Sequence, residues 1–350
     1  MSKPPTDLPD RPARIPPREA LFEDGEAARP LPVCDHYSGV EPRMRKSLEL
    51  QAELGPVFDV TLDGEDGAPV GGEHEHALLM CELVNSPLNH FGRVGIRVMP
   101  VDHPAFEAMV DTVVRKAGAR VAYLMIPKPR GLADLQRAVD TVDAASRAAG
   151  LAQPIPLQAL VETHGALREV QALAAHPRIE SLSFGLMDFV SAHRGAIPAS
   201  AMSATGQFEH PLVRRAKLEI AAACHGFGKT PSHCVVTEFK DEGALAEAAH
   251  KASRELGYTR MWSIHPSQVR VIVDAFAPST AEVDMAIEIL LAAQEAGWAP
   301  IRHRDTLHDR ASYRYFWHLL QRAHQTSYAG GAQLPASVRE AFFETPAGAA

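Results

Sequence analysis

Eight short apolar segments recur along the middle of the chain, and each ends in a polar residue before an Ala-, Leu-, Glu- and Arg-rich stretch. Near-continuous apolar, β-branched runs of this length are typical of strands buried on both faces, as in parallel sheets. We expect these strands to begin near Leu31, Val57, Val94, Val121, Ile155, Ile179, His233 and Met261.

The stretches between these segments have helical periodicity. Residues 106–118 and 132–150 place apolar side chains at i, i+3, i+4 and i+7, and both end in a glycine, as helices often do. Strand–helix alternation repeated eight times predicts an α/β protein with a (β/α)8 TIM barrel. An open doubly wound sheet is the alternative, but no GxGxxG motif follows the first strands, which argues against a Rossmann domain.

The same pattern divides the chain into three parts. Residues 1–30 are rich in proline and charge, and we expect a loosely ordered N-terminal arm there. Residues 31–298 contain the barrel, and residues 299–350 are expected to form a C-terminal helical lid or oligomerisation extension.

The composition and net charge of the chain indicate which kinds of partner it can bind. The chain has 350 residues, 46% of them apolar, which is enough for one large core, and a formal net charge of -8. This charge gives no overall attraction for nucleic acid or anionic membranes, so we expect neither as a partner.

The four cysteines form no CxxC pair, no apolar run reaches 18 residues, and the N-terminus lacks the apolar core of a signal peptide. We therefore expect reduced thiols in a cytoplasmic protein.

Charged and polar residues stand where the predicted strands end. In a (β/α)8 barrel the chemistry lies at the carboxyl ends of the strands. These positions are Asp63, Glu65, Asp66, Arg97, Lys128, Glu162, Asp188, Glu238 and His265. Because we expect the barrel interior to be apolar, ionised groups at the strand ends indicate a polar mouth with a cation site and an anion site.

Glu162 and Asp188 follow neighbouring strands, so their carboxylates can converge. Two hard oxygen ligands, completed by substrate oxygens and water, suit octahedral Mg²⁺ at roughly 2.1 Å per bond. Such an ion polarises the carbonyl of an oxo acid. The alternative is that one carboxylate caps the following helix and the other pairs with Lys128.

Arg97 is the only charged residue of its strand, and a charge there is costly unless it is paired. A guanidinium suits a substrate carboxylate or an enolate oxyanion. The alternative is a structural pair with Asp63 or Glu65. Glu65 and Asp66 could orient Arg97 or metal-bound water, or simply belong to a solvated turn, since glycines flank them.

Two further residues are candidates for substrate binding. A Schiff-base lysine needs a desolvated amine with a depressed pKa, so we expect Lys128 to pair with the acids or with substrate instead. His265 is a base, a hydrogen-bond donor or a core histidine. His74 and His76 are two residues apart and share no helix face, so we do not expect them to bind a metal.

Seven motifs in order resemble the citrate lyase β-subunit/HpcH–HpaI aldolase superfamily, from about Pro32 to Ser279. They are VFDVTLDGEDGAP, VGIRV, IPKPRGLADL, LVETHGAL, LSFGLMDF, EFKDEGAL and WSIHPSQV. The resemblance implies a TIM barrel with Mg²⁺ held by Glu162 and Asp188, and an Arg97 that binds substrate and stabilises the enolate. It also implies a supporting role for the acids at Glu65 and Asp66.

The resemblance further implies an activity. Family members cleave or form a carbon–carbon bond between a 2-oxo acid and an acetyl-type enolate, often a CoA thioester, and usually assemble as trimers or hexamers. Many carry a C-terminal lid whose Asp acts as a base in a neighbouring subunit; Asp309 is the best match here and Asp305 the second. We therefore expect a Mg²⁺-dependent carbon–carbon lyase. A malate-synthase-like or pyruvate-handling Mg²⁺ enzyme and a non-catalytic barrel subunit are the alternatives.

The chain also departs from the family pattern near the mouth. CDHYSG replaces the usual vPG, GEDGA replaces LEDAV, and the bulky Trp262 precedes the small residue that stands before IHP. We expect the substrate to differ from citrate or malate.

Overall fold

A computed structural model describes residues 15–23 and 30–343 of the chain. The chain divides into two compact units. The barrel unit comprises residues 30–276 and 328–331, and the helical unit comprises residues 277–327 with the remaining N- and C-terminal segments.

The barrel unit is a closed barrel of eight strands in sequence order, with β8 paired to β1 and every neighbouring pair parallel. The strands are β1 (Cys34–Ser38), β2 (Phe58–Asp63), β3 (Val94–Arg97), β4 (Leu124–Ile126), β5 (Leu157–Val161), β6 (Ile179–Phe184), β7 (Thr230–His233) and β8 (Arg260–Ser263). The predicted (β/α)8 fold is therefore confirmed.

Strand β7 differs from the expectation. We placed this strand from His233 onward, but the residues that pair with β6 and β8 are Thr230–His233. The segment TPSH contains proline and two hydroxyl side chains, so it lacks the apolar signature of its neighbours. The apolar residues that follow it lie beyond the strand.

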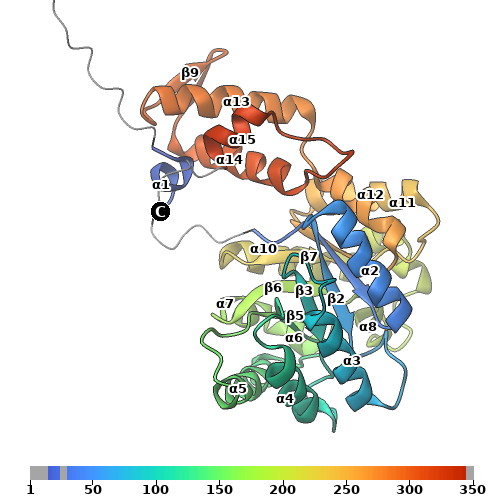
Figure 1. Ribbon diagram of the computed structural model, residues 1–350. Coiled ribbons are helices and arrows are strands. Elements are labelled where there is room, and N and C mark those ends of the chain that lie inside the picture. The colour runs from blue at the N-terminus through green and yellow to red at the C-terminus, as the bar shows by residue number, and fades with distance from the viewer. Residues whose placement is uncertain (1–14, 24–29, 344–350) are drawn as a thin grey trace, which may run out of the picture. The chain divides into compact units, whose positions relative to one another are not determined.

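Helices lie outside the strands (Figure 1). They are α2 (Glu41–Leu54), α3 (Glu73–Asn85), α4 (Phe106–Ala117), α5 (Leu132–Ala148), α6 (His164–Arg168), α7 (Val170–Ala175), α8 (Leu186–Ser191), η1 (Ala199–Met202), α9 (Gly206–Glu209), α10 (Pro211–Gly226), α11 (Glu242–His250), η2 (Lys251–Glu255) and α12 (Pro266–Phe276). Helices α4 and α5 confirm the two helical patterns. Gly150, just beyond α5, has φ +68°, which glycine adopts without strain.

The barrel interior is not purely apolar, contrary to our expectation. Arg260 of β8 is fully buried, with Nη2 3.0 Å from Asp35 Oδ2 and Nη1 2.6 Å from Asp59 Oδ2. Arg93 Nε donates to Asp59 Oδ1 at 2.7 Å, and the Tyr123 hydroxyl donates to Asp35 Oδ1 at 3.1 Å. Strands β8, β1 and β2 are thus joined by buried ion pairs as well as by backbone hydrogen bonds.

The helical unit contains α1 (Pro17–Leu21), α13 (Thr280–Glu295), β9 (Ile301–His303), β10 (Thr306–His308), α14 (Arg310–Gln325) and α15 (Ala336–Phe342). Its core includes Leu21, Leu290, Trp317 and Leu320. Trp298 Nε1 donates to the Ile15 carbonyl at 3.0 Å, so described residues of the N-terminal segment are held here.

The boundaries differ from those we expected. Helix α13 packs in the helical unit, so the continuous part of the barrel unit runs to residue 276 and not to 298. Residues 17–21 of the expected loose arm form a helix, and residues 1–14 and 24–29 lie outside the described part.

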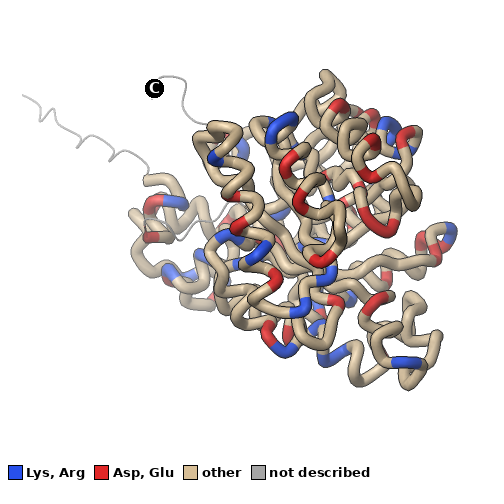
Figure 2. Tube along the Cα trace, turned by 90° about the horizontal axis from the view of Figure 1, so that it is seen from below, with Lys and Arg blue, Asp and Glu red and all other residues tan. Residues whose placement is uncertain are grey.

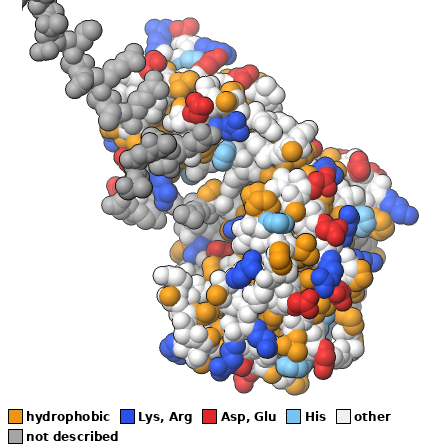
Figure 3. Space-filling view, viewed as in Figure 1, with side chains coloured by type: hydrophobic (Ala, Val, Ile, Leu, Met, Phe, Trp, Pro, Cys, Tyr) orange, Lys and Arg blue, Asp and Glu red, His pale blue; other side chains and the backbone are white. Residues whose placement is uncertain are grey.

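Charge is distributed in small, mixed groups. Basic and acidic positions are interspersed along the trace (Figure 2), and the face in Figure 3 shows charged side chains of both signs scattered among apolar ones. Among the described residues, none of the helices combines the length and hydropathy needed to cross a bilayer.

We predict that Arg260→Met destabilises the protein by about 3–5 kcal/mol, because it leaves the buried carboxylates of Asp35 and Asp59 without this partner. Urea unfolding measures the change. The control is Arg45→Met, which removes exposed ion pairs and should cost less than about 1 kcal/mol. Equal effects of the two substitutions would contradict a structural role for the buried pairs.

Candidate active site

The loop after β2 is folded around one carboxylate. Asp63, the last residue of β2, accepts the backbone N–H of Glu65 on Oδ1 and that of Gly67 on Oδ2, each at 2.9 Å. A Cβ on Gly67 would lie only 2.3 Å from Asp63 Oδ2. The glycine is therefore needed for the loop to approach this carboxylate, and Glu65 is placed over the strand ends.

Arg97 ends β3 directly beside Asp63 in the strand register. Its Nε donates to Asp63 Oδ1 at 2.7 Å and its Nη2 to Oδ2 at 2.5 Å, and Nη1 lies 3.1 Å from Glu65 Oε2. Burial disfavours the charge of Arg97, but the charge and hydrogen bonds of Asp63 together with the charge of Glu65 outweigh it and raise the pKa of Arg97. The guanidinium is permanently charged and held in one orientation.

The alternative that we considered for Arg97, a structural ion pair with Asp63, is present. The guanidinium nevertheless keeps N–H donors that can bind an anion. Asp63 takes two of the five N–H donors of the guanidinium, and the contact with Glu65 is an ion pair without hydrogen-bond alignment. Glu65 Oε2 is itself buried and accepts no hydrogen bond from the described residues. Donors therefore remain on Arg97 for a substrate oxygen.

Lys128, which follows β4, links the acidic loop after β2 to Asp188 in α8. Its Nζ lies 2.5 Å from Glu65 Oε1, 2.7 Å from Asp66 Oδ2 and 3.7 Å from Asp188 Oδ1. Partial burial acts against its charge, but the hydrogen bonds with Asp66 and Glu65 raise the pKa of Lys128. An amine held in this way stays protonated and is unsuited to a Schiff base. The same hydrogen bond lowers the pKa of Asp66, despite the opposing effect of burial.

Glu162 follows β5 and is 3% exposed. Its Oε1 accepts the backbone N–H of Lys128 at 2.8 Å, a geometry that holds Lys128 at φ +50°. Burial, and next the negative charge of Asp188, raise the pKa of Glu162 to about 8. Asp188 lies in the first turn of α8 and is partly exposed. Neither carboxylate caps a helix, because Thr163 caps α6 and α8 has no side-chain cap; Asp188 does lie within ion-pair distance of Lys128, as the alternative required.

Gly185 makes room for the Glu162 carboxylate. A Cβ at this position would lie 2.2 Å from Glu162 Oε2. The chain therefore passes close beside the carboxylate at the end of β6, which brings Glu162 and Asp188 toward the same space. Our sequence reasoning did not single out this glycine, although its place just before α8 was visible.

These two carboxylates fit a divalent cation. Glu162 has no cationic side chain within ion-pair distance among the described residues, and the nearby charge of Asp188 makes its ionisation unfavourable. A divalent cation removes that repulsion, and Mg²⁺ accepts two carboxylates when water and substrate complete its shell. No group of three or more His, Cys, Asp or Glu suited to a metal occurs in the described part of the chain, so protein alone does not complete a site. His76, for example, bonds the Asp63 carbonyl through Nε2.

Two aromatic residues complete the surroundings of Arg97. Its guanidinium carbon lies 5.4 Å from the ring centre of Tyr37 and 5.5 Å from that of Trp262. Tyr37 belongs to β1 and Trp262 to β8, and their rings are 4.2 Å apart. Sequence reasoning noted Trp262 as a departure from the family pattern but did not place either ring at the guanidinium.

Two predicted site residues lie elsewhere. His265 is exposed, bonds Ser267 Oγ through Nδ1 at 2.8 Å and stacks on Phe239 at 4.9 Å, so it is not a core histidine. Phe239 and its neighbours line a cavity formed by the loop after β7. Asp309 belongs to the helical unit, where its Oδ1 accepts the N–H groups of Ala311 and Ser312 at the start of α14.

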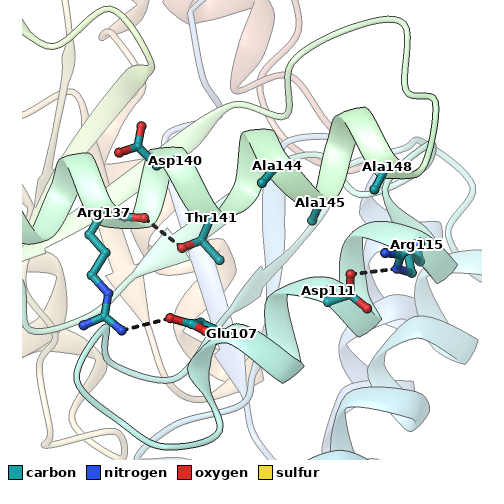
Figure 4. A pocket seen from close by; sticks show the side chains of 9 residues that line it. All are labelled: Glu107, Asp111, Arg115, Arg137, Asp140, Thr141, Ala144, Ala145 and Ala148. Atoms are coloured by element: carbon teal, nitrogen blue, oxygen red, sulfur yellow. Dashed lines mark hydrogen bonds and ion pairs between the residues drawn. The ribbon is translucent and has the colours of Figure 1, made fainter.

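A second hollow, between α4 and α5, is not a site candidate. Figure 4 shows Arg137 paired with Glu107, and Arg115 paired with Asp111. These exposed charges neutralise one another on a helix surface, and no buried polar group faces the hollow.

The model of the HpcH/HpaI aldolase/citrate lyase family matches residues 58–266. The chain belongs to this family. It is 54% identical to a citrate lyase from Burkholderia xenovorans LB400 whose crystal structure is known, with a TM-score of 0.80 over 94% of this chain and 100% of the other. The expected family and carbon–carbon lyase class are therefore confirmed.

Other relatives are more distant. An L-malyl-CoA/beta-methylmalyl-CoA lyase of Cereibacter sphaeroides is 28% identical over 68% of this chain and 77% of its own. A (3S)-malyl-CoA thioesterase of the same species is 30% identical over 72% and 80%. CitE of Mycobacterium tuberculosis, solved with magnesium, acetoacetate and coenzyme A, shares the fold at 19% identity and a TM-score of 0.62, over 84% of this chain and 98% of that one.

We predict that Gly185→Ala weakens Mg²⁺ binding by this family member at least about tenfold, since the added methyl group must displace the Glu162 carboxylate. Isothermal titration calorimetry with Mg²⁺ measures the affinity. Gly226→Ala is the matched control, because a Cβ there meets nothing within 4 Å. An unchanged Mg²⁺ affinity for Gly185→Ala would show that Glu162 is not a ligand.

We also predict that Mg²⁺ binding releases protons in a pH-dependent way. With the pKa of Glu162 raised to about 8, the free carboxyl is largely protonated at pH 7, and binding expels about one proton. The number should fall toward zero above the raised pKa, near pH 9 and beyond. Calorimetry in two buffers of different ionisation enthalpy counts these protons; a pH-independent count near zero would refute the assignment.

Proposed function

We propose that the protein is a Mg²⁺-dependent lyase that cleaves or forms the bond between a 2-oxo acid and an acetyl-type CoA thioester enolate. The observation that carries the proposal is the buried Glu162, whose carboxylate lies beside Asp188 and close to a fixed guanidinium and ammonium. An oxo acid needs a metal cation to polarise its carbonyl group, and its carboxylate and the enolate oxygen need positively charged donors nearby.

Each residue has a defined part in this proposal. Glu162 and Asp188 hold Mg²⁺, which when bound polarises the oxo-acid carbonyl and stabilises enolate charge. Arg97 uses the donors that Asp63 leaves free to bind the substrate carboxylate or enolate oxygen. Lys128 and the acids Glu65 and Asp66 fix one another and keep the mouth polar, and His265, two residues after β8, is kept as a substrate-binding candidate.

Two parts of the proposal rest on the family alone. Asp309 is the proposed base, supplied by a neighbouring copy of the chain, and the protein is proposed to be a homotrimer or hexamer. We also propose a cytoplasmic location. All four cysteines are free and buried, which supports a reduced environment. Neither nucleic acid nor membrane has a part in the reaction.

The relatives support this reaction class and add a second candidate. The malyl-CoA lyase relatives favour a malyl-type thioester as substrate, and the neighbour solved with magnesium and coenzyme A favours both ligands here. The malyl-CoA thioesterase relative favours hydrolysis of the same thioester. A malate synthase of Haloferax volcanii shares the fold at 17% identity, so the malate-synthase-like alternative rests on fold alone.

A product assay separates these reactions. The purified protein is incubated with Mg²⁺ and malyl-CoA, citramalyl-CoA or β-methylmalyl-CoA, and the oxo acid and free CoA are measured separately. The lyase predicts glyoxylate or pyruvate together with an acyl-CoA, and a thioesterase releases free CoA without an oxo acid. Glyoxylate with acetyl-CoA as substrates tests condensation.

We expect Glu162→Gln and Asp188→Asn each to lower kcat by about 100-fold or more, because either change removes a charged metal ligand. EDTA should abolish the wild-type activity. Full activity of both variants in EDTA would eliminate the metal mechanism. Asp102→Asn is a suitable control, since this exposed carboxylate pairs only with Arg130 among the described residues.

A further inference from the structure

A small buried cluster at the barrel interior stands apart from the main core. Its members are Tyr37, Met125, Leu160, Val235 and Trp262. They come from β1, β4, β5, the segment after β7, and β8, so the cluster spans the barrel. Met187, next to the metal-ligand candidate Asp188, packs against it. This apolar wall therefore adjoins both the cation site and Arg97.

The two aromatic members carry polar atoms that the fold leaves unsatisfied. Tyr37 is 5% exposed and Trp262 is 9% exposed, and Tyr37 Oη and Trp262 Nε1 have no hydrogen-bond partner among the described residues. A buried Tyr or Trp normally finds a partner for this atom, because leaving a buried donor unpaired is costly. Both rings lie within 5.5 Å of the same guanidinium carbon, so these two unsatisfied side chains border the anion site.

Other buried tyrosines of the barrel show the contrast. Tyr258 is also fully buried, but its hydroxyl donates to the Lys217 carbonyl at 2.9 Å. The Tyr123 hydroxyl bonds Asp35 and Thr61. The packing of the barrel thus satisfies tyrosine hydroxyls away from Arg97 and leaves unpaired the one that lies against it.

We infer that Tyr37 and Trp262 determine specificity for the 2-oxo acid: their O–H and N–H donate to its carboxylate oxygens beside Arg97, and their rings limit its side group. This inference rests on the proposed function. The carboxylate needs further donors here, because Asp63, Glu65, Asp66 and Asp188 already pair with Arg97 and Lys128 and offset their positive charge. The indole next to the guanidinium would limit the group attached to the carbonyl carbon, C2, to a hydrogen or a methyl group, as in glyoxylate or pyruvate.

Direct binding tests the donors. Affinity for pyruvate and for oxalate is measured by calorimetry in saturating Mg²⁺ with the full chain. We expect Tyr37→Phe to weaken both ligands about 5- to 30-fold while Mg²⁺ affinity changes less than twofold. Tyr258→Phe, which loses an equally buried hydroxyl away from Arg97, should leave both affinities unchanged. Thermal unfolding of each variant verifies that it is folded.

A second variant tests whether the Trp262 ring limits the size of the oxo-acid side group. Trp262→Phe removes the N–H and part of the ring volume, and should raise the affinity for 2-oxobutyrate relative to pyruvate at least fivefold. Trp262 is the only tryptophan between residues 30 and 276. Ligand-induced quenching of fluorescence should therefore be present in the wild type and lost in this variant.

The outcomes separate the two proposals. If the wild type binds neither oxo acid in the presence of Mg²⁺, the proposed function itself fails. If the wild type binds them and Tyr37→Phe binds equally well, or Trp262→Phe leaves the 2-oxobutyrate to pyruvate ratio unchanged, only the role of the two aromatic residues is overturned.

Discussion

The ion pair between Arg97 and Asp63 is the interaction on which the mouth of the barrel depends. It joins the carboxyl ends of two neighbouring strands with two hydrogen bonds, at 2.7 and 2.5 Å. Asp63 at the same time accepts two backbone N–H groups of the loop that carries Glu65. A bidentate, buried pair of this kind fixes direction as well as charge. The guanidinium can therefore present its remaining donors at one place in the mouth.

From this pair the charges continue around the mouth in a chain. Glu65 lies between Arg97 and Lys128, and Lys128 extends toward Asp188 while its backbone N–H holds Glu162. Positive and negative groups thus compensate one another in pairs. Among the described residues, however, Glu162 accepts a hydrogen bond only from the neutral backbone N–H of Lys128, and the charge of Arg97 acts on it from beyond ion-pair distance. Its raised pKa expresses that imbalance. The imbalance is the reason to assign a cation to this position and not to the other acids.

A second buried network, around Arg260, serves a different purpose. It links β8 to β1, the pair of strands that closes the barrel, and to β2. Buried ion pairs contribute little net stability but are strongly destabilising when one partner is removed. The network therefore favours one closure register of the barrel, while the Arg97 network is left for ligand binding. The barrel holds both networks without a shared ion pair among those described.

The fold class of this protein and the order of its strand-end residues follow from the sequence alone. Strand–helix alternation predicted the barrel, and because consecutive strands of a (β/α)8 barrel are neighbours in space, Glu162 and Asp188 could be placed together from their order alone. Only the tertiary structure decided the rest. The Arg260 network joins residues more than 200 positions apart through barrel closure, strand β7 is defined by its neighbours and not by its own apolar residues, and α13 belongs to the helical unit through its packing. The stacking of Tyr37 and Trp262 on Arg97 likewise depends on β1 and β8 meeting. Local pattern fixes which segments become strands and helices, whereas contacts between distant segments arise only when the barrel closes.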